Sequence, residues 1–279
     1  MSEVREGAFA RYVGARLGGL PGVRAVTLGG SRADGRQRDD SDWDFSLYYR
    51  GAFEPERIRD LGWAGEVFPI GGWGGGVFNG GAWLTVDGRR VDVHYRDLDD
   101  VERHLAEAAA GWFRVEPLAF HLVGVPTYIV VAELATRRLL AGSLPSVDEY
   151  PRALRAAAPP RWLEQASTTL GYARAAHALR GHLSDTGGAI AVALACAAHA
   201  VLAARGEWIT NDKHLIDRAG LRPADAALAG LTADPASLAR AIDRAEAFIN
   251  AAVAGIPAAR PRRTRDDRAS NSASIEDEG

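Results

Sequence analysis

The two stretches that decide the fold are Leu28-Gly29-Gly30-Ser31-Arg32 and Ser41-Asp42-Trp43-Asp44-Phe45. The first follows Val23 to Leu28, an apolar and β-branched run that is typical of a strand. Glycines at the end of a strand allow a close backbone approach, and a helix that begins at Ser31 would direct free backbone N–H groups at one point. This turn is therefore predicted to bind an anion such as a phosphate.

Two carboxylates, Asp42 and Asp44, stand at the start of a second predicted strand, Trp43 to Tyr49. Because alternate residues of a strand point to the same face, both carboxylates share one face while Trp43 and Phe45 take the other. Their Cα atoms are then about 6.6 Å apart. This spacing allows both side chains to bind a pair of divalent ions that lie ~3.5 to 4 Å apart.

A third carboxylate, Asp92, lies in a later predicted strand, Arg90 to Tyr95. Valines and a tyrosine form the apolar face of that strand, which leaves Asp92 and His94 on its polar face. Three carboxylates on neighbouring strands repel one another strongly unless a cation lies among them. The pattern therefore predicts Mg²⁺ bound by oxygen ligands.

Two other interpretations of the same residues stay open. In the first, Asp39-Asp40-Ser41-Asp42 is a solvated turn held by Asx hydrogen bonds, and the remaining carboxylates lie on an exposed sheet face. In the second, Gly29-Gly30-Ser31-Arg32-Ala33 is the nucleophile turn of a serine hydrolase, although Ala33 stands where such turns have glycine. Neither interpretation explains why two separate strands carry carboxylates on one face.

The chain resembles the nucleotidyltransferase superfamily typified by DNA polymerase β and the antibiotic nucleotidyltransferases. In that family a Gly-Ser pair precedes an Asp-x-Asp motif, and a third acidic residue follows on a later strand. The matching positions here are Gly30-Ser31, Asp42-x-Asp44 and Asp92, and the resemblance covers Val23 to Asp97. It implies an α+β fold in which a mixed sheet with flanking helices is followed by an α-helical bundle domain.

The resemblance also implies a role for each matching residue. Ser31, at the Gly30 turn, would hold the nucleotide phosphates, and Asp42 and Asp44 would bind two Mg²⁺ ions. Asp92 would complete the catalytic metal site and help deprotonate the acceptor hydroxyl. Arg32, beside Ser31, is a further candidate for holding the triphosphate.

Lys213 is the only lysine among the 33 basic residues of the chain. The segment Trp208 to Lys213 resembles one that follows the long bundle helix in related nucleotidyltransferases, where a lysine reaches the nucleotide phosphates. Lys213 is therefore a candidate phosphate ligand. The other interpretation, a surface charge near the start of a helix, stays open.

Changes in composition divide the chain into three parts. Residues 1–142 mix strand and helix patterns and form the predicted catalytic domain, while residues 143–256, rich in Ala, Leu and Arg, form a predicted helical substrate-binding domain. Residues 257–279 form a predicted disordered tail. The predicted helices are Arg5 to Leu17, Leu98 to Ala110, Pro126 to Leu140, Trp162 to Leu179 and Ile190 to Ala204, and the predicted strands besides those given above include Ala82 to Val86.

Composition and charge limit the classes of function. The chain has 279 residues, 47% of them hydrophobic, and a net charge of only -3, which argues against a nucleic-acid partner. A single cysteine, Cys196, excludes an internal disulfide, and the charged segment Met1 to Arg16 is unlike a secretory signal. The alanine-rich run Gly187 to Ala204 is typical of a buried bundle helix rather than a membrane span. These features indicate a cytoplasmic protein without a membrane partner.

The sequence therefore predicts a Mg²⁺-dependent nucleotidyltransferase. It would move a nucleoside monophosphate, AMP from ATP first among the candidates, to a hydroxyl of a small acceptor such as an aminoglycoside-like antibiotic, and release pyrophosphate. Two alternatives remain. One is a protein adenylyltransferase of the antitoxin type, and the other is a nucleotide-binding module without catalysis.

Overall fold

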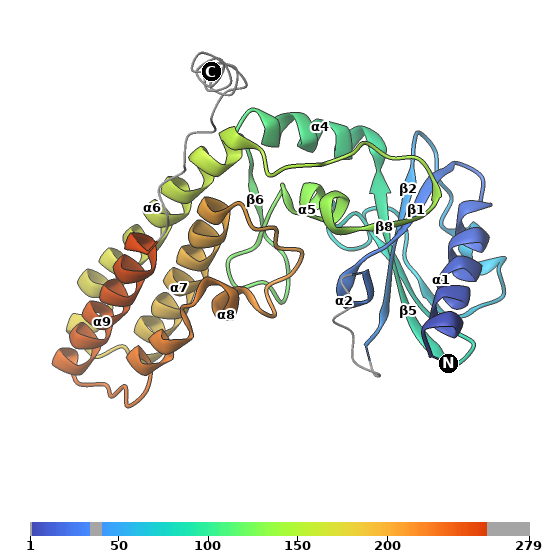
Figure 1. Ribbon diagram of the computed structural model, residues 1–279. Helices are drawn as coiled ribbons and strands as arrows, with labels where there is room; N and C mark the ends of the chain where they lie inside the picture. The colour runs from blue at the N-terminus through green and yellow to red at the C-terminus, as the bar shows by residue number, and fades with distance from the viewer. Residues whose placement is uncertain (1, 34–40, 256–279) are drawn as a thin grey trace, which may run out of the picture.

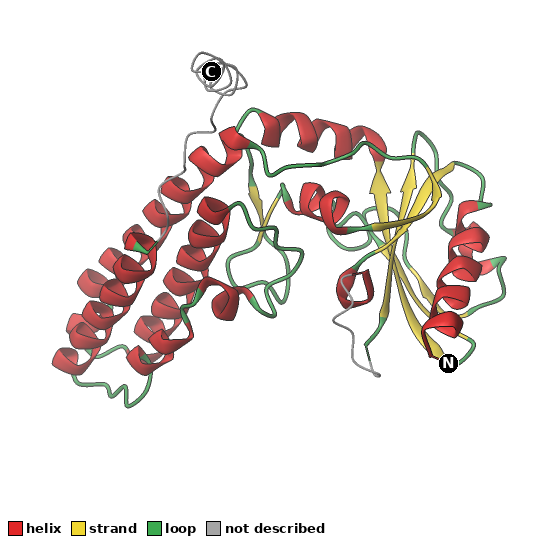
Figure 2. Cartoon of the chain, in the orientation of Figure 1, coloured by secondary structure: helices red, strands yellow, loops and turns green. Residues whose placement is uncertain are grey.

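The computed structural model describes residues 2–33 and 41–255 of the chain. A six-stranded sheet with helices on both faces is followed by a region made of helices (Figures 1 and 2). The predicted fold class, a mixed sheet with flanking helices and further helices after it, is confirmed. The predicted tail, 257–279, lies outside the described residues.

The elements have the following bounds. The helices are α1 (Ser2–Gly18), α2 (Gly30–Ala33), α3 (Glu56–Arg59), α4 (Leu98–Ala109), α5 (Ile129–Thr136), α6 (Arg152–Ala176), α7 (Leu183–Arg205), α8 (Leu215–Ala219) and α9 (Pro235–Ala254), with 3-10 helices η1 (Ala178–Arg180) and η2 (Arg222–Ala227). The strands are β1 (Val23–Leu28), β2 (Trp43–Tyr49), β3 (Ala64–Val67), β4 (Gly81–Val86), β5 (Arg89–Asp97), β6 (Val115–Glu116), β7 (Val125–Pro126) and β8 (Arg138–Gly142).

The main sheet has the strand order β3-β4-β5-β2-β1-β8. Within this described sheet, β2 and β5 are parallel and every other neighbouring pair is antiparallel. The parallel pair lies in the middle of the sheet, although the β3–β4 hairpin separates its strands in sequence. The two strands that carry the predicted acidic residues are therefore direct neighbours.

The two faces of the sheet have different coverings. Trp43, Phe45, Val91 and Val93 are buried on one face, where α1 packs through residues that include Phe9. The opposite face carries the polar positions of β2 and β5 and is covered in part by α4 and α5 (Figure 1). Alternation along each strand thus separates the hydrophobic core from the acidic residues.

The helical region contains α6, α7 and α9, which pack together around alanine-rich faces. Its core also includes side chains from the earlier segments, such as Phe113 and Tyr128 beside Trp162. Packed side chains therefore join the sheet region to the helical region, in addition to the segment 143–151 that connects β8 to α6. The predicted boundary between residues 142 and 143 stays a prediction.

Part of the predicted helix Pro126 to Leu140 is wrong. The helix α5 ends at Thr136, and Arg138–Gly142 forms the edge strand β8, which pairs antiparallel with β1. The pairing supplies backbone hydrogen-bond partners to β1, and this long-range gain outweighs the local helical preference of the leucines and alanine.

The helix α7 is, within the described residues, the one helix long and apolar enough to cross a membrane by length and composition. Its most apolar window is 67% buried inside the helical region. Burial of this kind fits the predicted role of the alanine-rich run as a core helix. Cys196 is also buried there.

Candidate functional site

The structure brings the three predicted acidic residues together at one end of the parallel strand pair. Asp44 on β2 lies directly beside Asp92 on β5 in the strand register, and Asp42 stands just before β2. Each carboxylate is close enough to influence the others, since the charge of Asp42 raises the pKa of both Asp44 and Asp92. The predicted cluster therefore exists as a spatial arrangement.

The charge of this cluster is only partly compensated. Burial and then the neighbouring Asp92 carboxylate raise the pKa of Asp44 from 3.8 to about 6. Burial, followed by Asp42, also raises the pKa of Asp92, against an opposing effect of Arg90 and Lys213. Because negative charges crowd here in a poorly solvated place, a cation would be stabilised among them.

Asp42 forms an ion pair with Arg90, which compensates part of its charge. Arg90 Nε lies 2.7 Å from Asp42 Oδ1, as part of an ion pair that is exposed on the arginine side. The contact lacks hydrogen-bond geometry, and Oδ1 is a buried atom with no hydrogen-bond partner among the described residues. The guanidinium therefore holds Oδ1 by charge attraction, and a cation bound at this oxygen would compete with Arg90.

The glycine turn lies directly against Asp44. Gly29 N donates a hydrogen bond of 2.8 Å to the backbone oxygen of Asp44. Gly30 has φ +63°, and a Cβ added to it would lie 1.9 Å from Asp44 Oδ2. Only glycine therefore fits here, both because of its backbone conformation and because the carboxylate occupies the space of a side chain.

Ser31 and Arg32 are both predicted to contact phosphate, and the structure describes the side chain of Arg32 only. Ser31 lies in the short helix α2, but its side chain is outside the part of the chain that the structure describes. Arg32 donates to Ser41 O at 2.8 Å, pairs with Glu6 at 3.2 Å and stacks over the Trp43 ring at 4.3 Å. The guanidinium of Arg32 is thus engaged beside the apolar face and is not brought to the carboxylates.

On the Trp43 side of β2 the surface has a cavity of about 460 Å³, whose lining includes none of the three acidic residues. Its lining includes Arg32, Arg89 and Arg90, with Trp43 on one side. The Arg89 guanidinium lies 4.4 Å from the centre of the Phe9 ring. Of these three arginines, Arg90 is the one that pairs with a carboxylate of the acidic cluster, Asp42.

Lys213, from the helical region, reaches the same site. It stands in the loop between α7 and α8, where its backbone N donates to Asn211 Oδ1 at 3.1 Å, and its side chain is exposed. Its positive charge lowers the pKa of both Asp44 and Asp92, so the ammonium group lies within electrostatic range of both carboxylates. The structure therefore places Lys213 together with the acidic cluster.

Sequence reasoning did not find the ion pair between Arg96 and Glu133, deeper on the polar face. Arg96 Nε and Nη2 donate to the two oxygens of Glu133 at 2.8 and 2.6 Å, and the Arg96 side chain is 2% exposed. Burial opposes ionisation of Glu133, but Arg96 outweighs it and holds the pKa of that carboxyl below its ordinary value. The one hint in the sequence is a single carboxylate inside the apolar run Ile129–Thr136.

His94 lies between the acidic cluster and this ion pair. Its ring packs edge-on to Trp73 at 5.6 Å and to Phe78 at 5.8 Å. Burial, and then the Arg96 charge, lower the pKa of His94 from 6.5 to about 4. The imidazole is therefore neutral at neutral pH, which suits a structural contact between two charged groups.

Comparisons with known proteins add little to this geometry. No protein-family model matches the chain, and no curated protein matches it in sequence. One similar solved structure is that of a nucleotidyltransferase-like protein from Exiguobacterium sibiricum 255-15, with 10% identity and a TM-score of 0.40. The match covers 88% of this chain and 74% of that chain. Because this likeness is slight, the functional conclusion depends on the residues of the site.

Proposed function

We propose that the protein is a Mg²⁺-dependent nucleotidyltransferase. It moves a nucleoside monophosphate from a nucleoside triphosphate, with ATP as the first candidate, to a hydroxyl of a small molecule, and pyrophosphate leaves. The observation that carries this proposal is the direct pairing of Asp44 with Asp92 in the parallel strand register, with Asp42 at the start of the same strand. The sequence resemblance described above supports the same chemistry, and an aminoglycoside-like antibiotic is the acceptor class that it suggests.

The residues present fit a pair of Mg²⁺ ions. Carboxylate oxygens are the ligands that Mg²⁺ prefers, and Asp42, Asp44 and Asp92 supply six of them. The raised pKa of Asp44, caused by burial and by the neighbouring carboxylates, is expected where carboxylates bind a cation together. When bound, Mg²⁺ orients the triphosphate and offsets charge on the attacking and leaving oxygens.

The chain's own groups would then hold and orient the substrates. The acceptor oxygen forms a bond to the α-phosphorus while the bond from that phosphorus to the bridging oxygen of pyrophosphate breaks. Asp92 is the carboxylate we propose to help remove the hydroxyl proton. Because Gly30 has no side chain, the Asp44 carboxylate can lie directly against the turn that would hold the triphosphate.

Positive charge for the phosphates would come chiefly from Lys213. Its ammonium group is exposed and already within range of the two paired carboxylates. Arg32 would reach a phosphate only after leaving Glu6 and the backbone of Ser41. A lysine contributed by the helical region would couple nucleotide binding to the arrangement of the two regions.

The first experiment is a thermal-shift series with the four nucleoside triphosphates, each with and without Mg²⁺. We expect stabilisation that requires Mg²⁺, prefers one nucleotide and is lost in Asp42→Asn and Asp44→Asn. The matched control is Asp60→Asn, an exposed acidic residue after α3, which should behave as the wild type. Nucleotide transfer at the wild-type rate by either cluster variant would show that the site is assigned wrongly.

A second measurement separates the alternatives. Pyrophosphate release that depends on an added hydroxyl-bearing small molecule supports the proposed enzyme. Release that requires a protein acceptor supports a protein adenylyltransferase instead. Tight nucleotide binding without turnover on any acceptor would indicate a binding module.

A further inference from the structure

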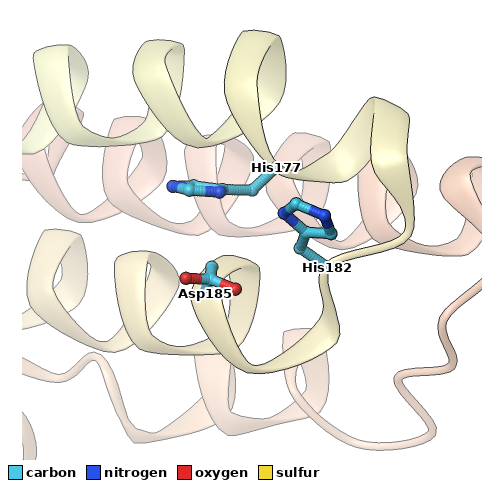
Figure 3. Close-up of side chains that lie close together, drawn as sticks. All are labelled: His177, His182 and Asp185. Carbon is cyan, nitrogen blue, oxygen red and sulfur yellow. The ribbon is translucent and has the colours of Figure 1, made fainter.

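The turn between α6 and α7 brings two imidazoles and one carboxylate together (Figure 3). His177 follows the last residue of α6, His182 precedes α7, and Asp185 lies in the first turn of α7. One ligand atom from each residue lies within 4.8 Å of the ligand atoms of the other two. The turn is at the end of the helical region that points away from the sheet (Figure 1), so the cluster is separate from the acidic site.

The backbone fixes the positions from which these side chains extend. His182 N donates to His177 O at 3.2 Å, which closes the turn that contains η1. Gly181 has φ +69°, and a Cβ on it would lie 2.4 Å from Ala233 O, so the turn also packs against the segment before α9. Because the Cα atoms are held in place, the binding of a ligand would cost side-chain entropy but little backbone entropy.

The bonding capacity of the three side chains is unused. Among the residues that the structure describes, none of the three has a hydrogen-bond or ion-pair partner for its side chain. His177 Nδ1 is a buried nitrogen without a partner, while the His177 ring contacts Tyr172 edge-on at 5.4 Å. The His177 and His182 rings are 5.8 Å apart. Buried polar atoms in folded proteins nearly always have a hydrogen-bond partner, and a bound ligand would give this imidazole nitrogen one.

We propose that His177, His182 and Asp185 form a binding site for a transition-metal ion of the Zn²⁺ class. Two imidazole nitrogens and one carboxylate oxygen are donors that suit Zn²⁺, whereas Mg²⁺ and Ca²⁺ prefer oxygen alone. Bonds of about 2.0–2.1 Å place tetrahedral ligands roughly 3.4 Å apart, so the side chains must close by about 1.5 Å or less. His182 and Asp185 are exposed and can rotate to do so.

The ion would fasten the end of α6 to the start of α7. Three protein ligands leave a fourth position of the tetrahedron open to water on the exposed side. The helices α6 and α7 pack against each other more extensively than any other helix pair of the helical region. An ion bound at the turn between them would therefore stabilise this pair. This proposal is independent of the nucleotidyltransferase assignment, because it uses no residue of the acidic cluster.

The test is calorimetric titration of Zn²⁺ into the full chain, purified without a histidine tag, in millimolar Mg²⁺. We expect one high-affinity Zn²⁺ per chain. His182→Ala should weaken binding by more than the roughly 10- to 100-fold that loss of an outer-shell partner costs, and Asp185→Asn should also weaken it. The matched control is His214→Ala, an exposed histidine before α8, with unchanged affinity.

Two further readouts make the result decisive. Zn²⁺ should raise the melting temperature of the wild type but not that of His182→Ala, whose far-UV circular dichroism should match the wild type. Co²⁺ bound in place of Zn²⁺ should give visible absorption bands that disappear in His177→Ala. The proposal is overturned if the wild type binds no Zn²⁺ at micromolar concentration, or if Asp44→Asn rather than His182→Ala abolishes binding.

Discussion

The carboxylate of Asp44 occupies the space that a side chain on Gly30 would need. A Cβ on Gly30 would lie 1.9 Å from Asp44 Oδ2, and the positive φ of Gly30 disfavours any other residue. We therefore expect Gly30→Ala to lower the free energy of unfolding by at least about 1–2 kcal/mol and to displace Asp44. Urea denaturation and the Mg²⁺-dependent nucleotide shift should both report the change.

Gly29→Ala is the matched control for this prediction. A Cβ on Gly29 meets only the backbone oxygen of Asp44, at an ordinary 3.9 Å. That variant should keep nucleotide binding within about twofold of the wild type. Equal losses of nucleotide binding in the two variants would mean that the conformation of the turn, and not its contact with Asp44, controls binding.

The raised pKa of Asp44 predicts a pH-dependent effect of its removal. Since its pKa is about 6 in the folded protein and 3.8 ordinarily, the unfolded chain loses this proton first as the pH rises. Ionisation of Asp44 therefore lowers stability between these two values, and the full cost, at most about 3 kcal/mol, persists at higher pH. Without metal, Asp44→Asn should raise the free energy of unfolding at pH 7.5 by up to that amount.

At pH 4.5 the same substitution should raise the free energy of unfolding by only about 1 kcal/mol. Urea denaturation in a chelating buffer at the two pH values measures the difference. Adding Mg²⁺ at pH 7.5 should stabilise the wild type but not the variant. A gain that is the same at both pH values would contradict a raised pKa at Asp44.

Lys213 should contribute to nucleotide binding and little to folding. Its charge acts on Asp44 and Asp92, but its side chain is exposed. We expect Lys213→Ala to raise the nucleotide KM about tenfold, as loss of one charge-assisted hydrogen bond would, and to change stability by less than about 0.5 kcal/mol. Lys213→Arg should restore part of the affinity, and Arg240→Ala, an exposed residue of α9, should have no effect.

The buried Arg96–Glu133 pair should be needed for stability. Glu133→Leu leaves the 2% exposed Arg96 without its carboxylate partner, which typically costs about 3–5 kcal/mol. Combining it with Arg96→Met should recover at least half of that loss, because no charge then remains unpaired. Glu102→Gln breaks the exposed pair with Arg50 and should cost no more than about 1 kcal/mol, as urea denaturation can show.

The strands that carry the acidic residues could be predicted from local sequence. The bounds of β1 and β2 agree with the expected ranges, because β1 is an apolar, β-branched run and β2 begins with alternating apolar and polar residues. The same alternation places Asp44 and Asp92 on one face, and the structure brings them together. Whether they bind metal and transfer a nucleotide stays a prediction.

Features that depend on distant contacts could not be predicted. The strand β8 has no alternation of its own and exists because β1 has a free edge to pair with. The helix α6 continues through Pro159 and Pro160, where local rules place a helix start, because packing against α7 outweighs the lost hydrogen bonds. Glu133, in helix α5, is charged within an apolar run because Arg96 of strand β5 pairs with it.

Along β5, residues that face the acidic cluster alternate with residues that face the hydrophobic core. Asp92 lies between Val91 and Val93, both fully buried on the opposite face. Insertions in the loop of the β3–β4 hairpin, residues 68–80, would leave this order undisturbed, since loops tolerate added residues well. A single residue inserted within β5 ahead of Asp92 would turn this carboxylate toward the core and a valine toward the acidic cluster. Length variation in homologous chains should therefore be found in this hairpin loop and be absent from the two acidic strands.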